Sequence, residues 1–571
     1  MAALLVGGVP RRAAIGAAAA LAALGGWALL TTLWNGIPVV ALDLAGLMVT
    51  GAACLLLGSS LHRTLRIPAV AGVAIGLAGH AATTQVIVGT GLFPDDWFNG
   101  RQLEGSLGYH NGLAAAYVLG LPLALYFGAD ARRPIRFAGA AGTVLLLSTV
   151  LLTQSRAALL AIGLGVVLMV LLSRSWFTVV GAAALIPVSV VLFLLLRPVD
   201  DALVDLIGST SATPEQGPFT TYVVVTFLLA AAAGALMAVV PAVALGSTRR
   251  RALARVGAAV AVVGVVAATV VIAVNADDLS DRFSVSPNSP SQVEGGSTRL
   301  SSLSPTGRLE QWRLAVTMIG EEPARGHGAG TFARRWTIER DNKDLHVLQP
   351  HSIELETAAE LGVVGTVLLA IAALGVALLL FRGRPGDRRL RVAVAAVALQ
   401  FLLMASVDWV FSFPLLLGAT LLLAGVAGGS GTGRASNSLI VIAGGLAGLV
   451  LLAGPALGSW YLDRAVAAGQ RSPTEAARLA ARARSFNRWD PAIVSFQGRL
   501  LEAGGANDRA AAAYARAADL SQQPWLDLYR QARALDSAGR SLASLQACRR
   551  AITANPLERI LQSGVCDGVE P

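Results

Sequence analysis

Residues 307–332 read GRLEQWRLAVTMIGEEPARGHGAGTF, and residues 349–365 read QPHSIELETAAELGVVG. The first segment has apolar residues at three- and four-residue steps starting at Leu309, which predicts an amphipathic helix. A turn rich in proline and glycine follows over residues 323–330. His351 then stands where a long hydrophobic run begins. We expect this stretch to hold arginine and histidine side chains against a membrane surface.

The composition of the chain is that of a polytopic membrane protein with an all-α fold. Of its 571 residues, 54% are hydrophobic and only 14% are charged, whereas soluble domains carry about 25% charged residues. The net charge of +10 does not indicate nucleic-acid binding. Many of the arginines lie in short loops between apolar runs, which is the positive-inside pattern of membrane proteins.

A membrane span needs about 20 apolar residues, and we predict thirteen spans on this basis. They are 13–34, 37–61, 67–93, 112–128, one ending at 153, one from 157 to 174, 177–196, 222–245, 256–276, 361–381, a two-span hairpin at 392–428, and 439–460.

The arginine clusters also predict the orientation of the spans. With a cytoplasmic N-terminus, every cluster in a short loop between spans lies on the cytoplasmic side. The loops 94–111 and 197–221 then lie outside the cell membrane. The domain order that follows is membrane helices in 1–276, an extracytoplasmic loop at 277–357, membrane helices in 358–460 and an extracytoplasmic tail at 461–571.

The tail has a repeat of its own. Pro491, Pro524 and Pro556 recur at steps of 33 and 32 residues, and Gly505 and Gly539 are 34 apart. Each is followed by an amphipathic helical pattern. This period resembles that of tetratricopeptide repeats, so we expect a short helical solenoid that could bind a protein partner.

The order of motifs between two predicted spans resembles that of the O-antigen ligase and O-antigen polymerase family. The resemblance starts near Ser106 and does not cover the tail. The matching pieces are Gly307-Arg308, Trp312, Pro323, Gly326, Gly328, Gly330, Phe332, His351 and Glu360-Leu361-Gly362-Val363-Val364-Gly365.

The resemblance implies an inverting membrane glycosyltransferase with a fold similar to the GT-C type, in a bacterial inner membrane. Such an enzyme moves an oligosaccharide from a polyprenyl-pyrophosphate carrier to an acceptor hydroxyl on a glycan, a lipid or a protein. A lipid-linked glycan flippase without chemistry is the alternative, although flippases rarely need so long an outer loop. A membrane-anchored scaffold is a third interpretation, but thirteen spans exceed what a tether needs.

Three arginines are candidates for binding the pyrophosphate, because a guanidinium binds phosphate oxygens bidentately and keeps its charge. The resemblance assigns this role to Arg156, which lies in the Ser155-Arg156 pair between two apolar runs, and to Arg308. Arg313 is a weaker candidate on the same helix. The alternatives are an arginine that snorkels to the headgroups at Arg156 and a solvated helix face at the other two.

His351 matches the loop histidine of the family and is the candidate base, since a neutral imidazole can accept a hydroxyl proton near pH 7. His327 and His346 are rivals in the same loop. Glu354 could orient His351 or act itself. The structural alternatives are an interfacial anchor for His351 and a helix-capping role for Glu354. The family often has Asn after this histidine, whereas Ser352 stands here.

Two further polar residues are candidates near the predicted outer surface. The family tends to show an Asn at the position of Asn111, where an N-cap on the following span is the structural alternative. Asp408 is an intramembrane carboxylate, for which we expect a function and an arginine partner.

We predict no metal and no other cofactor. The acidic pairs at 95–96, 200–201 and 277–278 could hold a divalent cation, but adjacent aspartates in turns are more often solvated. The resemblance implies arginines in place of a metal, and the chain has no P-loop. Cys548 and Cys566 both lie in the tail, where an oxidising compartment allows a disulfide.

Overall fold

The structure is a computed structural model of the 571-residue chain. It describes residues 12–208 (except 92, 95, 96 and 174), 216–239, 248, 252, 308–340, 346–382, 388–429, 438–469 and 471–569 (except 563 and 568). The predicted ninth span, the loop before 308, and the acidic pairs 95–96 and 277–278 lie outside these ranges.

Ten helical elements and one small β-hairpin are described before the loop. They are α2 (Arg12–Leu30), η1 (Thr31–Leu33), α3 (Pro38–Ser60), α4 (Arg63–Thr90), the antiparallel pair β1 (Phe98–Asn99) and β2 (Gln102–Leu103), η3 (Gly105–Leu107), α5 (His110–Gly128), α6 (Arg133–Thr153), α7 (Arg156–Ser173), α8 (Trp176–Gly208) and α9 (Gln216–Val239).

The loop and the helices after it complete the described chain. They are α13 (Arg308–Glu321), α14 (Thr331–Glu339), α15 (Ile353–Phe381), α16 (Arg388–Ala405), η6 (Trp409–Ser412), α17 (Pro414–Gly428), α18 (Ser438–Gly469), α19 (Pro473–Phe486), α20 (Pro491–Ala503), α21 (Asn507–Leu520), α22 (Trp525–Ser537), α23 (Ser541–Ala554), η8 (Arg559–Gln562) and η9 (Gly564–Cys566).

Nine helices within the described ranges are long and apolar enough to cross a membrane. This confirms the prediction of an all-α, multi-pass membrane protein. The number of thirteen spans and the likeness to the GT-C type stay predictions. Large apolar side chains such as Ile186 and Leu228 are 69% and 64% exposed, as expected for helix faces whose solvent is lipid.

One predicted loop is partly wrong. Residues 197–208 do not form a loop, because α8 continues through them to Gly208, and α9 begins at Gln216 rather than Tyr222. Val199, Ala202 and Leu203 recur at three- and one-residue steps on a buried face, which extends the amphipathic pattern beyond the apolar run.

The chain divides into two compact units, which we describe separately. The first contains α4 to α9, α16 and α17. It also contains the start of α2 and the ends of α3 and α15, which we predict to lie on the cytoplasmic side. Its central helix is α5, which is buried along nearly its whole length and packs against α6, α7 and α16. Tyr117 and Tyr222 are among its fully buried side chains.

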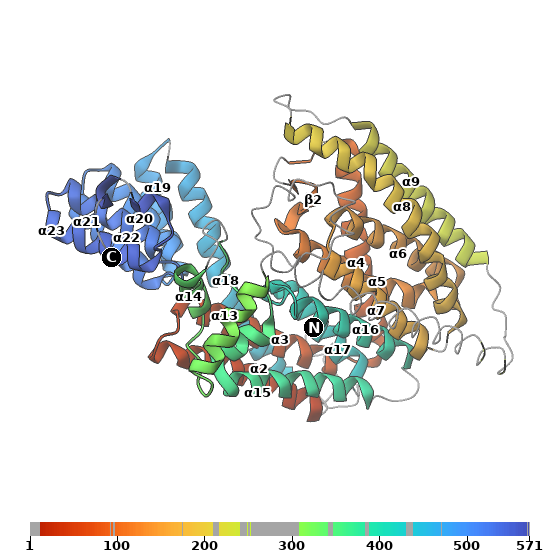
Figure 1. Ribbon diagram of the computed structural model, residues 1–571. Coiled ribbons are helices and arrows are strands. Elements are labelled where there is room, and N and C mark those ends of the chain that lie inside the picture. Colours follow the sequence, from red (N-terminus) through yellow and green to blue (C-terminus); the bar gives the residue numbers. More distant parts are fainter. Residues whose placement is uncertain are drawn as a thin grey trace. The chain divides into compact units, whose positions relative to one another are not determined.

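The second unit contains residues 18–53, 308–372 and 442–571. Its loop helices α13 and α14 lie beside the first part of α15, the end of α2 and the beginning of α3 (Figure 1). A small core joins them, in which Phe332 and Trp336 of α14 pack with Leu314 and Met318 of α13 and Ala359 of α15.

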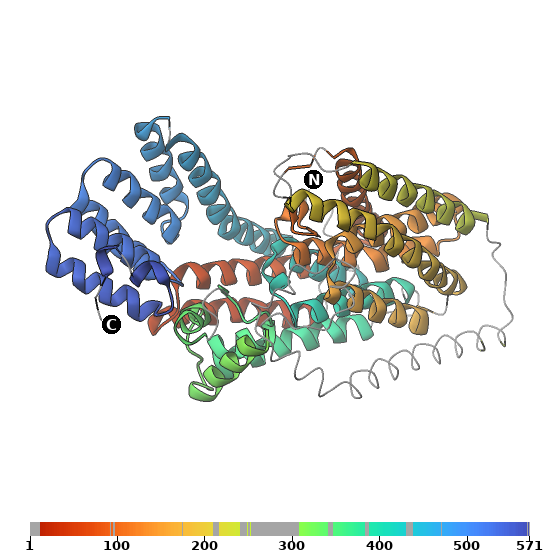
Figure 2. The same cartoon turned by 45° about the horizontal axis from the view of Figure 1, so that its top comes forward.

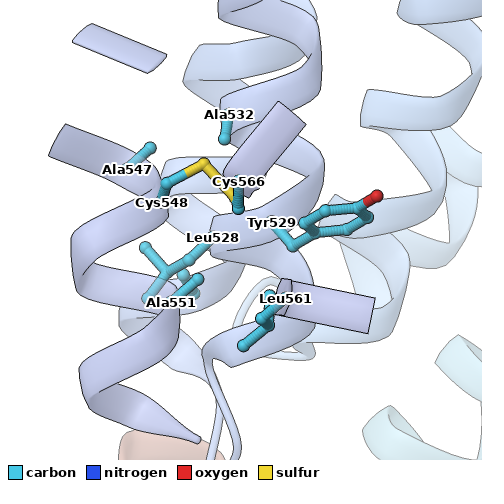
Figure 3. Close-up of a cluster of buried hydrophobic side chains, with 9 residues drawn as sticks. Leu528, Tyr529, Ala532, Ala547, Cys548, Ala551, Leu561 and Cys566 are labelled. Atoms are coloured by element: carbon cyan, nitrogen blue, oxygen red, sulfur yellow. A yellow bond between two sulfur atoms is a disulfide. The ribbon is translucent and has the colours of Figure 1, made fainter. Parts of the chain in front are cut away.

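The tail helices α20 to α23 pack in sequence order, each against the next (Figure 2). Cys548 of α23 and Cys566 of η9 form the predicted disulfide. The two sulfurs are buried with Leu528, Tyr529 and Leu561 (Figure 3), so η8 and η9 are part of the tail core. The tetratricopeptide assignment stays a prediction.

Candidate functional site

The proline- and glycine-rich turn pairs with a break in α15. Backbone hydrogen bonds run from His327 N to Ala359 O (3.0 Å), from Gly328 N to Glu360 O (2.8 Å) and from Val363 N to Pro323 O (2.8 Å). These bonds use the carbonyl and amide groups that a helix interior would otherwise pair with itself. The turn at residues 323–330 and the segment 359–363 of α15 are therefore bonded to each other.

Glycine is required where the two sides meet. Gly362 has φ +63° and ψ −161°, a conformation that is essentially confined to glycine. A Cβ at Gly362 would lie 2.6 Å from Ala324 O, and one at Gly326 would lie 2.4 Å from the Glu360 backbone. The close approach of the turn to α15 thus depends on the absence of both side chains.

The side chain of Glu360 bonds to the backbone at the end of the turn. Its carboxylate is buried and accepts hydrogen bonds from Gly330 N (2.7 Å) and Phe332 N (2.9 Å), the amides at the start of α14. A negative charge is favourable at a helix N-terminus, where amides have no partner within the helix. In the sequence, Glu360 is only one residue of a motif, and no local signal there indicates this role.

The turn and the break in α15 are also bonded to α2 and to the segment that joins α2 to α3. Ala329 N donates to Thr31 Oγ1 (3.0 Å), and Ala329 O accepts from Ile37 N (2.8 Å). The indole of Trp27 donates to Leu361 O (2.9 Å), and that of Trp34 to Gly326 O (3.3 Å). The turn and the break in α15 are therefore held against the end of α2 and the segment that follows it.

His351 lies just before α15 and contacts α13. Its Nδ1 is 2.9 Å from Gln311 Oε1 and 3.1 Å from the Gln349 carbonyl. A carbonyl can only accept, so Nδ1 carries the proton and Nε2 carries the lone pair in the neutral ring. His351 has φ +55°, which is uncommon outside glycine and marks a position held by its surroundings.

The backbone around His351 is fixed from both sides. Trp312 of α13 donates its indole N–H to Pro350 O (2.9 Å). Ser352 directly precedes α15, and its hydroxyl accepts from Leu355 N (3.4 Å) and donates to Glu354 Oε2 (3.0 Å). Glu354 itself is exposed in the first turn of the helix, a favourable place for a carboxylate. Its role beside His351 stays a prediction.

The two candidate arginines of α13 lie on different faces of that helix. Arg308 precedes Gln311 by three residues, so the two are neighbours on the helix surface, and Gln311 contacts His351. Arg313 is exposed, and a separation of five residues turns it about 140° away from Arg308. The loop thus brings Arg308, but not Arg313, to the side of α13 that His351 occupies.

The rival histidines occupy other places. The imidazole Nε2 of His327 is 3.0 Å from Met318 O and 3.5 Å from Glu321, which itself pairs with Arg335 (2.9 Å). These contacts tie the turn to the end of α13. His346 is exposed.

In the first unit, Arg156 is the first residue of α7, after the short connection from α6. The preceding Gln154 has φ +53°, and its amide donates to Asp200 Oδ1 (2.7 Å) and to Arg101 O (3.0 Å). Asp200 is 2% exposed on α8. The interpretation of the pair at 200–201 as solvated turn residues is therefore wrong for Asp200, because α8 continues through it and buries it.

Asn111 and Asp408 belong to one buried cluster. The Asn111 amide donates to Asp408 Oδ2 (2.8 Å), and the Tyr109 hydroxyl donates to Asp408 Oδ1 (2.7 Å). Asn111 lies inside the first turn of α5, which begins at His110, so its interpretation as an N-cap is wrong. Asp408 instead caps η6 through Trp409 N (2.8 Å). An arginine partner for Asp408 stays a prediction.

Three of the connecting residues carry no local signal in the sequence. Gln311, Tyr109 and Gln154 each act on a partner at least 40 residues away, and only the folded chain pairs them. Arg101, whose carbonyl accepts from Gln154, belongs to the same group.

The sequence matches none of the curated proteins with which it was compared. A protein-family model does match residues 218–370, a range that includes α13, the turn, His351 and the break in α15 but not the tail. The family is described as O-antigen ligase, and over this range the chain is similar to it.

Proposed function

We propose that the protein is a membrane glycosyltransferase of the O-antigen ligase or polymerase type. One observation carries the proposal: His351 donates from Nδ1 to Gln311 and Gln349, so its Nε2 is the basic nitrogen. Arg308 lies one helical turn from Gln311. A base and a permanent cation on one small scaffold suit the attack of a hydroxyl on a glycosyl diphosphate.

The donor in this proposal is an oligosaccharide on a polyprenyl pyrophosphate. The acceptor oxygen attacks the anomeric carbon, and its proton passes to His351 Nε2. The bond between the anomeric carbon and the pyrophosphate oxygen breaks, and the pyrophosphate leaves with the electron pair. Attack in line with this bond inverts the anomeric centre. Arg308 and Arg156 would stabilise the charge on the leaving group, a role in which Arg313 is secondary.

The proposal includes the orientation expected from the arginine clusters. The loop and the tail lie outside the inner membrane, where the disulfide is stable. The reaction needs no metal, so activity is expected to persist in EDTA, whereas loss in EDTA with recovery in manganese would contradict this part. The tail, as a tetratricopeptide-like domain, would bind the acceptor or a protein partner.

The test is the surface glycan of a deletion strain complemented with the wild-type gene or with His351→Ala. We expect His351→Ala to behave as the deletion, since the base is lost. His346→Ala is the matched control, because it removes an exposed histidine of the same loop. Short unpolymerised units would identify a polymerase, and full-length carrier-bound chains would identify a ligase. Unchanged glycans with His351→Ala would contradict the proposal.

A further inference from the structure

A hydrogen bond between two buried side chains joins the tail to the loop. Arg340, which directly follows α14, is 3% exposed, and its Nη2 donates to Asn555 Oδ1 (3.0 Å). Asn555 follows α23 and is fully buried. A buried guanidinium is costly without partners, and Asn555 supplies one of them.

Three further hydrogen bonds join the same parts of the chain. Arg334 of α14 donates through Nε (3.2 Å) and Nη2 (2.9 Å) to the carbonyl of Ser521, between α21 and α22. Gln523 donates its amide to Val347 O (3.4 Å), four residues before His351. Val347 also packs against the core of the loop.

The strand of chain that leads to His351 is therefore held between two supports. On one side, α13 bonds to Pro350 O and to the His351 ring. On the other side, the tail bonds to Val347 O, and the end of α14 is tied to Asn555. The conformation of His351 is uncommon for a residue with a side chain, so it depends on such supports.

We infer that Asn555 and Arg340 are positioning residues for the loop histidine, so that the tail is a working part of the site rather than an appended binding domain. The catalytic meaning of this inference rests on the proposed function. It assigns a role to a segment that lies outside the range matched by the family model.

The test measures hydrogen–deuterium exchange of the full-length wild type and its variants in lipid nanodiscs. The exchange is compared at peptides that cover residues 346–352. Asn555→Leu removes the acceptor of Arg340 at similar volume. We expect exchange in this segment to become about tenfold faster or more, since a buried bond to a charged donor is lost. Asn555→Asp keeps the acceptor oxygen and is expected to restore slow exchange.

Two more variants keep the test decisive if Asn555→Leu does not fold. Gln523→Ala removes only the bond to Val347 O and is expected to speed exchange at 346–352 about twofold to tenfold. Arg549→Ala, on the exposed face of α23, is the matched control and is expected to leave exchange there unchanged. Slow exchange of α20 and α21 in each variant shows that the tail itself is folded.

Unchanged exchange at 346–352 in Asn555→Leu and Gln523→Ala would overturn the inference, as would an Asn555→Asp variant that behaves like Asn555→Leu. Surface glycans of the same strains give the functional readout, and they are expected to fall with Asn555→Leu and to recover with Asn555→Asp. The exchange measurement does not depend on glycosyl transfer. A failure of the proposed function would appear in His351→Ala, and a failure of this inference would appear in the exchange.

Discussion

The ring of His351 has its orientation determined by two oxygen acceptors, of which one is a side chain that can be changed. Gln311→Met removes that acceptor at similar size and leaves the Gln349 carbonyl. We predict a two- to tenfold fall in glycan transfer, because the bond that holds the base contributes about 0.5–1.5 kcal/mol. Gln311→Glu retains an acceptor and is expected to retain activity. Equal activity of Gln311→Met and wild type would show that the glutamine does not orient the base.

The motifs that resemble the family point to His351 and Arg308, whose roles stay predictions. They did not reveal the contacts of Gln311 or Glu360. A glutamine on a helix and a glutamate in an apolar run look like ordinary solvated or capping residues until the partner is known. Their partners come from the turn and from the segment before α15, at separations of 40 and about 30 residues.

At the scale of elements, the break in α15 is the feature most open to experiment. Gly362→Ala places a methyl group 2.6 Å from Ala324 O at a backbone conformation that alanine avoids. We predict a loss of stability of about 1–3 kcal/mol, seen as a lower midpoint of thermal unfolding, with loss of glycan transfer. Gly320→Ala, on α13 with nothing within 4 Å of the new Cβ, is the control and should be neutral or stabilising by up to about 1 kcal/mol.

A second prediction at this scale concerns the hydrogen bonds between α20 and α22. Burial raises the pKa of Asp527 above 3.8, and this effect is offset in part by hydrogen bonds from Ser495 and Arg530. The folded state therefore binds the proton more tightly than the unfolded state, and the contribution of Asp527 to stability decreases as pH rises through its folded pKa.

We expect the unfolding midpoint of the wild type, relative to Asp527→Asn, to rise as pH falls from 7 to 4. Thermal unfolding of the full-length protein at several pH values measures this difference. Asp536→Asn, at an exposed position of the same helix, is the matched control. A difference between wild type and Asp527→Asn that moves in the opposite direction would contradict the assignment of burial as the dominant effect.

The C-terminal ends of α5 and α15 agree with the predicted spans, because the apolar runs stop at Gly128 and before Arg382. The predicted start of the span at residue 361 lies inside α15, which begins at Ile353. The prediction failed where helix and apolar run do not coincide. The end of α8 is amphipathic rather than apolar, so a search for membrane spans stops at residue 196 while the helix continues to Gly208.

At the scale of the whole molecule, the disulfide tests which side of the membrane holds the tail. Cys548 and Cys566 are expected to be paired in protein taken from cells, because the tail is proposed to lie in an oxidising compartment. Alkylation without reduction, followed by mass spectrometry, measures this. Cys54, within α3, is the internal standard for a thiol that remains reduced. Two alkylated tail cysteines in native protein would contradict both the bond in cells and the proposed orientation.

The turn at residues 323–330 is bonded to Thr31 and Ile37, nearly 300 positions earlier in the chain. Synthesis proceeds from the N-terminus, so the ribosome completes α2 and α3 long before the turn emerges. Thr31 and Ile37, between α2 and α3, are therefore in place to bond the turn when it is synthesised. A fragment that starts after α3 would lack Thr31 and Ile37, and with them the partners that bond Ala329 of the turn.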